Sequence, residues 1–307
     1  MIRTVISTDK LSKIYGRLHA VQNVSLNVNK GEIYGFLGLN GAGKTTTIRM
    51  LLGMVRPSSG SVKINGRAVN AGSYQIWRDV GYMVEIPYAY PELTVFDNLE
   101  IVRKLRGISN RAATDEIIHK LSLQGCAGKK AKELSLGNAQ RMGLAKALIH
   151  EPKILLLDEP TNGLDPEGIV EIRNLLQYLA RDRDTTIFIS SHLLGEISLI
   201  ADRIGIIHEG ILINEINANE FERQRHKQVI INTVDNQRAL KILSQKGYAV
   251  SKRNQFIQCD DKKAVERPED ITVMLTNAGC PPKHIQIEAE DLETYFLRVI
   301  HSKGAVL

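Results

Sequence analysis

The sequence has few cysteines and no long apolar run, and both absences exclude classes of protein. Only three cysteines, Cys126, Cys259 and Cys280, occur far apart among 307 residues, which favours neither a disulfide framework nor a cysteine metal cluster. We expect reduced thiols in a cytosolic protein. No apolar stretch approaches the ~20 residues that span a bilayer, and the first ten residues, MIRTVISTDK, lack the apolar core of a secretory signal.

The chain also lacks a strong excess of one charge. It has 40 Lys and Arg against 34 Asp and Glu, a net charge of +6. A basic excess can attract nucleic acid, but spread over this length it points to no such partner, and none is expected. The 43% hydrophobic and 24% charged residues are the usage of a soluble globular protein, and the length predicts about two domains.

Strand-like and helix-like segments alternate over the first two thirds of the chain. Short all-apolar strands such as Ile154 to Leu157 are typical of a sheet that has helices on both faces, so the pattern predicts an α/β layered fold. The expected strands are 24–28, 32–37, 80–84, 154–157, 186–190, 203–208 and 211–216. The expected helices are 44–52, 112–121 and 167–181. Glu209-Gly210 predicts a hairpin turn between the last two strands.

The character of the sequence changes after Asn219. The charged stretch 222–227 (ERQRHK) predicts a linker, so we expect domains at 1–219 and 228–307. In the second domain, strands are predicted at 228–234, 248–251, 256–259 and 285–287, and helices at 237–246, 268–278 and 291–300. The order β-α-β-β-α-β suits a small α+β module of ferredoxin-like type.

The strongest local motif is a glycine-rich loop between a strand and a helix. It fits G-x-x-x-x-G-K-[ST] and consists of Gly38, Leu39, Asn40, Gly41, Ala42, Gly43, Lys44 and Thr45. Such glycines let the backbone wrap a phosphate, and the helix N-terminus adds positive potential. Lys44 can then reach the β- and γ-phosphates of a nucleotide, while Thr45 offers a hydroxyl to Mg²⁺.

A second motif joins an apolar strand to two carboxylates, Asp158 and Glu159. Asp158, at the carboxyl end of the strand, is placed to hold Mg²⁺ beside the phosphate loop. Glu159 is placed to polarise the water that attacks the γ-phosphate. Alone, the pair of carboxylates would equally fit a solvated acidic turn. In an α/β chain that also has a phosphate loop, the pair predicts a catalytic site at the carboxyl end of this strand.

A third motif, Leu134-Ser-Leu-Gly-Asn-Ala-Gln-Arg141, precedes a helix. Ser135 and Gly137 lie at the start of that helix, where backbone amides can bind an anion. By itself, this stretch also fits a plain capped helix.

Together these motifs resemble the nucleotide-binding subunits of ABC transporters over about residues 4–217. GLNGAGKT is similar to the family's Walker A, ILLLDE to its Walker B and LSLGNAQR to its signature. The resemblance implies a P-loop NTPase fold, Mg-ATP as the ligand and further roles. Asp165 matches the D-loop, His192 the switch histidine, Tyr15 the aromatic residue that stacks on adenine, and Thr46 extends the ATP-binding loop.

Two departures from the family pattern are informative. Leu136 stands where the signature usually has Gly, although Ser135 and Gly137 remain. Glu85 stands where most of the family has Gln, and it adds a carboxylate to the expected metal ligands. Glu85 and the segment 86–94 (IPYAYPELT) resemble the bacitracin and lantibiotic immunity subgroup. That segment predicts either a permease-docking surface or an irregular loop.

The resemblance implies an ATPase that energises a separate membrane permease. Each ATP would lie between Walker A of one subunit and the signature of a second, so a homodimer on the cytoplasmic face of the membrane is expected. The subgroup favours export of, or immunity to, a peptide antibiotic. Two alternatives stay open: the ATPase of another exporter, for a drug or other small molecule, and a DNA-handling ABC ATPase, which usually carries a coiled-coil or zinc-bearing insertion that is missing between Glu85 and Ser135.

Overall fold

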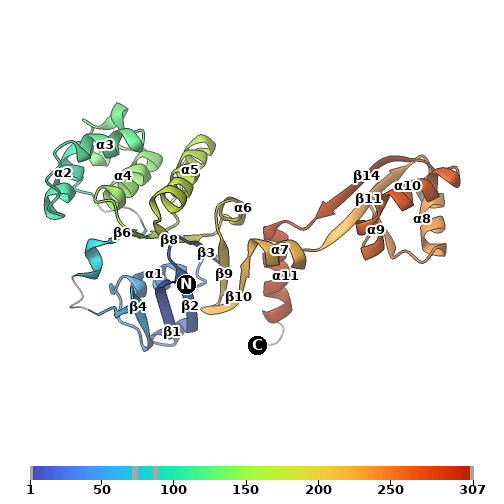
Figure 1. Ribbon diagram of the computed structural model, residues 1–307, viewed down its shortest axis with the longest axis horizontal. Helices are drawn as coiled ribbons and strands as arrows, with labels where there is room; N and C mark the ends of the chain where they lie inside the picture. The colour runs from blue at the N-terminus through green and yellow to red at the C-terminus, as the bar shows by residue number, and fades with distance from the viewer. Residues whose placement is uncertain (1–2, 71–74, 86–88, 305–307) are drawn as a thin grey trace. The chain divides into compact units, whose positions relative to one another are not determined.

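The computed structural model describes residues 3–70, 75–85 and 89–304, and it divides into two compact units (Figure 1). The first unit holds Met1–Ala218 together with Val299–Leu307, and the second holds Asn219–Arg298. Strands and helices alternate through the first unit, so the expected α/β class is confirmed.

A six-stranded sheet forms the centre of the first unit, in the order β10-β9-β3-β8-β7-β6. Five neighbouring strands run parallel, and β10 joins β9 as an antiparallel hairpin. The carboxyl ends of β3, β7 and β8 therefore meet at one edge, which is where ligands bind in such sheets. The strands are β3 (Ile33–Leu37), β6 (Val80–Met83), β7 (Ile154–Asp158), β8 (Thr186–Ser191), β9 (Arg203–His208) and β10 (Ile211–Asn217).

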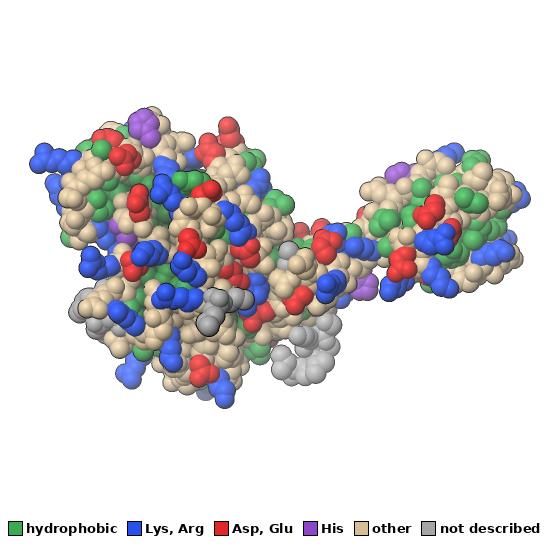
Figure 2. Space-filling view, in the orientation of Figure 1, with side chains coloured by type: hydrophobic (Ala, Val, Ile, Leu, Met, Phe, Trp, Pro, Cys, Tyr) green, Lys and Arg blue, Asp and Glu red, His purple; other side chains and the backbone are tan. Residues whose placement is uncertain are grey.

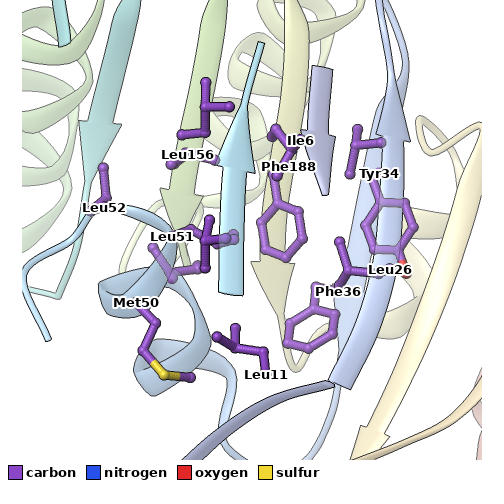
Figure 3. Packing of buried hydrophobic residues seen from close by; sticks show 14 of the residues in the cluster. Ile6, Leu11, Leu26, Tyr34, Phe36, Met50, Leu51, Leu52, Leu156 and Phe188 are labelled. Carbon is purple, nitrogen blue, oxygen red and sulfur yellow. The ribbon is translucent and has the colours of Figure 1, made fainter. Parts of the chain in front are cut away.

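An antiparallel sheet packs against this centre with helix α1 (Lys44–Leu51) between the two. Its order is β2-β1-β4-β5, with β1 (Thr4–Tyr15), β2 (Leu18–Asn29), β4 (Ser59–Ile64) and β5 (Arg67–Ala68). Figure 3 shows the core that results, in which the rings of Tyr34 and Phe188 stack at 5.5 Å and Phe36 lies 5.2 Å from Phe188. This apolar contact fixes α1 and its preceding loop against the central sheet.

Helices cover the other face of the central sheet, where Figure 1 shows α2, α3 and α4 gathered together. Helix α2 begins with a capping box between Thr94 and Asp97, and α5 begins at Pro166 with Asp165 as its cap. The helices are α2 (Val95–Leu105), α3 (Ala113–Lys120), α4 (Leu136–Leu148), α5 (Pro166–Arg183) and α6 (Leu194–Ser198). Short 3₁₀ turns occur at η1 (Ile76–Arg78), η2 (Gln124–Cys126) and η3 (Ala131–Glu133).

The second unit contains a four-stranded antiparallel sheet in the order β12-β13-β11-β14. The strands are β11 (Lys227–Thr233), β12 (Val250–Arg253), β13 (Phe256–Cys259) and β14 (Pro282–Ala289). Helices α8 (Asn236–Gln245), α9 (Lys262–Glu266) and α10 (Pro268–Asn277) pack on it over a separate apolar core. The first strand lies between the third and the fourth, which is the arrangement of the expected ferredoxin-like module.

Residues 222–227, expected to be a linker, include the end of a helix at 222–224 and the first residue of β11, Lys227. Helix α7 (Ala218–Gln224) contacts α11 (Leu292–Gly304) through Phe221, whose ring lies edge-on to that of Tyr295 at 5.4 Å. The Tyr295 hydroxyl donates a hydrogen bond to Gln224 Oε1 at 2.8 Å. The sequence did not predict this helix, because its one large apolar residue, Phe221, lies immediately before the charged stretch ERQRHK.

A buried ion pair supports the same helices. Both oxygens of Glu290 accept hydrogen bonds from Arg298 at 2.9 Å, and the His226 amide donates to the same carboxylate at 3.0 Å. Burial acts to raise the pKa of Glu290, but Arg298 and the His226 amide outweigh it and lower that pKa. The carboxylate is therefore charged, and it fastens the start of β11 to α11.

We expect Tyr295→Ala to destabilise the second unit strongly, because Tyr295 is 1% exposed and its ring fills the contact between α7 and α11. Removing a large buried ring costs about 3–5 kcal/mol. Tyr295→Phe is the matched control: it keeps the ring and loses one hydrogen bond, at a cost of about 1 kcal/mol. Urea unfolding of both variants measures the difference, and equal losses would contradict the packing role.

Candidate functional site

The glycine-rich loop lies between β3 and α1, at the edge where the parallel strands end. Gly43 has a φ of +105°, and a Cβ there would lie 2.4 Å from the Ala20 carbonyl oxygen, so no other residue fits without a shift. Helix α1 begins directly after it, with no side chain capping its first amides and no acidic residue in its first turn. These amides are available to an anion.

Lys44 is held in the loop as the sequence predicts. Its side chain is 6% exposed, and its ammonium donates to the carbonyl oxygens of Gly38 at 2.7 Å and Leu39 at 3.3 Å. The ammonium also lies 3.2 Å from Glu159 Oε1. The loop therefore presents one buried positive charge at the place where a triphosphate would end.

Asp158 connects the loop to two strands of the sheet. One of its carboxylate oxygens accepts a hydrogen bond from the Thr45 hydroxyl at 2.7 Å, and the other accepts one from the Ser190 hydroxyl. Asp158 is 3% exposed, and these bonds satisfy its buried oxygens. The two predicted Mg²⁺ ligands, Thr45 and Asp158, are thus direct neighbours.

Glu159 lies between Lys44 and His192. Its Oε2 lies 2.8 Å from His192 Nδ1 and also accepts a bond from the His192 amide at 3.3 Å. The residue has a φ of +50°, an uncommon value for a side chain of this type. The structure therefore brings together both residues that the sequence predicts to be catalytic.

A cleft of about 650 Å³ opens beside these groups. Tyr15 lines it and is 44% exposed, with Lys13 Nζ 4.9 Å from the centre of its ring. The loop residues in the cleft wall are Asn40, Gly41, Ala42, Gly43, Lys44, Thr45 and Thr46. An aromatic ring and a phosphate loop in the wall of one cleft suit the chemistry of a nucleotide.

Three predicted ligands lie elsewhere on the same chain. Ser135 caps α4 by accepting a bond from the Asn138 amide at 3.3 Å, and Asp165 caps α5 by accepting one from the Gly168 amide at 3.0 Å. Gly137 lies in the first turn of α4, and none of the three is in the wall of the cleft. Their contact with ATP stays a prediction.

The side chain of Leu136 explains why residue 163 is a glycine. A Cβ at Gly163 would lie 2.3 Å from the Leu136 side chain, and Gly163 has a φ of +75°. The departure at Leu136 is thus accommodated by the absence of a side chain at Gly163. Leu136 itself is 58% exposed, so it presents an apolar group beside the signature.

Glu85 is not brought to the expected metal ligands. Its carboxylate pairs with Arg49 of α1, at 2.6 Å from Nη2, and both side chains are partly exposed. Among the described residues, no bond joins Glu85 to Thr45 or Asp158. The predicted metal role of Glu85 stays a prediction, and residues 86–88 of the expected docking segment lie outside the described residues.

Two polar residues of the site were missed by the sequence reasoning. Ser190 binds Asp158, and Gln140 of α4 donates to the Glu159 carbonyl oxygen at 2.8 Å. A signal existed for Ser190: it is a polar residue at the end of an apolar strand, and it pairs in register with Asp158. Gln140 had no such signal, because a glutamine inside a helix is ordinary.

No helix in the described part of the chain is both long enough and apolar enough to cross a membrane. On the face shown in Figure 2, Lys and Arg side chains are interspersed with Asp and Glu. The described residues also include no group of three or more His, Cys, Asp or Glu arranged for a metal ion.

Comparisons with known proteins identify relatives of the chain. The model of the family described as "ABC transporter" matches residues 21–162. The chain is 46% identical over 242 residues to the bacitracin transport ATP-binding protein BcrA of Bacillus licheniformis, and this match covers 79% of each chain. It is 38% identical to the protein of the same name from Enterococcus faecalis, over 98% of this chain and 97% of that one.

A shorter relative lacks part of the chain. The lantibiotic transport ATP-binding protein SrtF of Streptococcus pyogenes is 37% identical, and the match covers 96% of it but 74% of this chain. That relative has no counterpart for most of the remaining quarter. Among solved structures, an ATP-binding subunit of an ABC transporter superposes with a TM-score of 0.65 at 27% identity, over 72% of this chain and 92% of that one.

A second solved structure, a dimeric ATP-binding cassette in a post-hydrolysis state with ADP and Pi, also has a TM-score of 0.65. Its sequence is 25% identical to this chain, and the match covers 69% of this chain and 98% of that one. Both structures are matched almost completely by about seven tenths of the present chain, so the likeness concerns a single cassette.

We expect Lys44→Ala to abolish nucleotide turnover and most nucleotide binding, because Lys44 carries the one positive side chain within the loop 38–46. Calorimetric titration with ATP and a phosphate-release assay measure the two effects. Lys13→Ala, which removes an exposed lysine near Tyr15, is the control and should change the affinity far less. Wild-type binding and turnover in Lys44→Ala would contradict the phosphate-loop assignment.

Proposed function

The chain belongs to the ABC transporter family of ATP-binding proteins, and we propose that it energises the export of a peptide antibiotic through a separate permease. It binds nucleotide and is an ATPase. The observation that carries the antibiotic proposal is the match to a bacitracin transport protein over 98% of this chain, which includes the second unit as well as the cassette. Such a substrate, by its size and charge, needs a membrane protein to hold it.

Hydrolysis follows from the groups around Glu159. Lys44 and the first amides of α1 bind the terminal phosphates, and Tyr15 stacks on the base. Glu159 Oε1 then accepts a proton from the attacking water, while His192 keeps the carboxylate in place through its contacts with Oε2. In the present arrangement Oε1 contacts Lys44. A bound triphosphate would compete for this ammonium, which frees Glu159 to meet the water.

Magnesium fits the donor set at this edge. The Thr45 hydroxyl and the Asp158 carboxylate are hard oxygen donors in direct contact, and Mg²⁺ prefers one or two such protein ligands together with substrate phosphates. Thr45 and Asp158 would hold the ion, and Glu85 is a further candidate. When bound, Mg²⁺ neutralises charge on the phosphate oxygens.

A homodimer is proposed because one chain leaves its site incomplete. The signature residues Ser135 and Gly137 are outside the cleft of their own chain, as is Asp165. A second copy can supply these residues to the cleft, with the start of its α4 facing the triphosphate. The exposed Leu136 next to them would then be buried between the two copies.

A groove of about 580 Å³ is the proposed docking place of the permease. It lies between β6, α2 and α4 and is lined by exposed apolar groups, among them Tyr82 at 42% and Leu105 at 82% exposure, beside the Arg49–Glu85 pair. Burial lowers the pKa of Lys146 and of Arg106 in its wall. An amphipathic permease helix fits such a surface, which would hold the chain at the cytoplasmic face of the membrane.

The two other functions are less well supported. A DNA-handling ATPase usually carries a long coiled-coil insertion before the signature, whereas the described residues between Glu85 and Ser135 form the short helices α2 and α3. Export of another small molecule uses the same ATPase chemistry, so only the substrate distinguishes it. Co-purification of the tagged chain from membranes would identify the permease.

The test of the substrate is resistance in cells. A strain that expresses the chain with its permease should tolerate more bacitracin than the same strain with Lys44→Ala, and its tolerance of an unrelated small-molecule drug should be unchanged. Unchanged bacitracin tolerance with raised drug tolerance would favour the general exporter. No difference for any compound, from a chain that hydrolyses ATP, would contradict export by this pair.

We expect Glu159→Gln to keep ATP binding and lose hydrolysis by about 10²–10⁴-fold, the usual contribution of a general base. Gln keeps the size and the contact with His192 but cannot accept the proton. ATP should stay unhydrolysed on the variant, as chromatography of the bound nucleotide would show. Glu167→Gln on α5, an exposed carboxylate away from the cleft, is the control and should hydrolyse ATP normally.

We expect Glu85→Gln to retain ATPase activity in the isolated chain but to reduce resistance in cells, because Glu85 and Arg49 form one wall of the groove. Arg49→Gln breaks the same pair and should act in the same direction. The measurement is the ratio of resistance to basal hydrolysis, together with the Mg²⁺ dependence of ATP binding. If neither differs from wild type, Glu85 has no part in coupling or in metal binding.

A further inference from the structure

Strand β14 forms one edge of the sheet in the second unit. It pairs with β11 on one side, from Lys227 opposite Ala289 to Thr233 opposite Pro282. On its other side, the described residues offer no strand that pairs with it, and Figure 1 shows β14 beside β11. An unpaired edge of this length is a ready template for another strand.

The register shows which groups face outward from this edge. The Glu290 amide donates to the His226 carbonyl oxygen at 2.7 Å, and these two residues lie directly opposite one another in the register of β11 and β14. Hydrogen-bonded pairs alternate along antiparallel strands, so Glu288, Gln286 and His284 bond toward β11. The amide and carbonyl groups of Ile285 and Ile287 therefore point away from the sheet.

The sequence of β14 is complementary to itself in one antiparallel register. If two copies pair about a two-fold axis at Gln286, Ile285 faces Ile287 of the other copy, and their outward groups meet as hydrogen-bonded pairs. His284 faces Glu288 of the other copy on the same face of the sheet. The two neighbouring registers are less complementary. An axis at residue 285 sets Lys283 opposite Ile287, and an axis at residue 287 sets Gln286 opposite Glu288, so neither register pairs His284 with Glu288.

The second half of the edge lacks two usual protections against pairing. Lysine and proline blunt natural edge strands, and in β14 they stand only at its beginning, as Pro282 and Lys283. Ile287, two residues before the end of the strand, is 42% exposed. Pairing with a second copy would cover this side chain with an isoleucine.

We propose that β14 is a self-association strand, which joins the second units of two chains into one continuous eight-stranded sheet. The partner is a second copy of this chain. This contact is separate from the ATP sites and needs no nucleotide, so it would keep two cassettes together when ATP is absent. It goes beyond the proposed ATP-driven dimer, which depends on the signature and the phosphate loop.

A cysteine at position 286 tests the register in the full chain. The two copies of residue 286 face one another as a non-hydrogen-bonded pair, whose Cβ atoms lie about 4.5–5.5 Å apart. Gln286→Cys should therefore form a disulfide-linked dimer on mild oxidation without nucleotide. The three native cysteines are buried and should not react. Lys252→Cys, on the opposite edge strand β12, is the control and should run as a monomer on a non-reducing gel, which preserves disulfides.

Ile287→Pro tests the pairing without a cross-link. The Ile287 amide points outward, so proline removes a donor that the intrachain ladder does not use. Sedimentation should show a dimer for the wild-type chain without ATP and a monomer for the variant, with ATP hydrolysis intact and urea unfolding of the second unit little changed. A monomeric wild-type chain, or equal cross-linking at positions 286 and 252, would overturn the proposal and leave the ATPase assignment untouched.

Discussion

The carboxylate of Asp158 is the constraint on which the nucleotide site depends. It is almost fully buried, and its two oxygens bind the hydroxyls of Thr45 and Ser190, which belong to α1 and β8. One side chain thus holds the phosphate loop, its own strand and the neighbouring strand at a common edge. Glu159 and His192 follow directly after the two tied strands, so their mutual contact is set by the same bonds.

The parts of the site that the sequence predicted are those that local rules determine. A strand followed by GLNGAGKT has few conformations that suit its glycines, and an all-apolar strand ending in Asp158 belongs to the same parallel sheet, where the carboxyl ends of the strands share one edge. The ferredoxin-like module was predictable for the same reason, since alternating strands such as β11 show their buried face directly. Helix α2 was missed although Thr94 and Asp97 form a capping box that the sequence displays.

The rest depends on contacts between segments far apart in the chain. Glu85 stays a predicted metal ligand, and its partner in the structure, Arg49, comes from the last turn of α1, a pairing that no local pattern reveals. Helix α7 was read as a linker because its stability comes from Tyr295, more than seventy residues later. Charge and spacing suggest what a residue can do, while the tertiary fold decides which partner it meets.

The division of the chain has a consequence for its synthesis on the ribosome. The first compact unit contains the last turns of α11, from Val299, although the second unit lies between them and the cassette in the sequence. Domains generally fold in the order in which they leave the ribosome. Here the segment from Val299 leaves the ribosome only after the whole second unit has been made, so the first unit gains this segment later than its other parts.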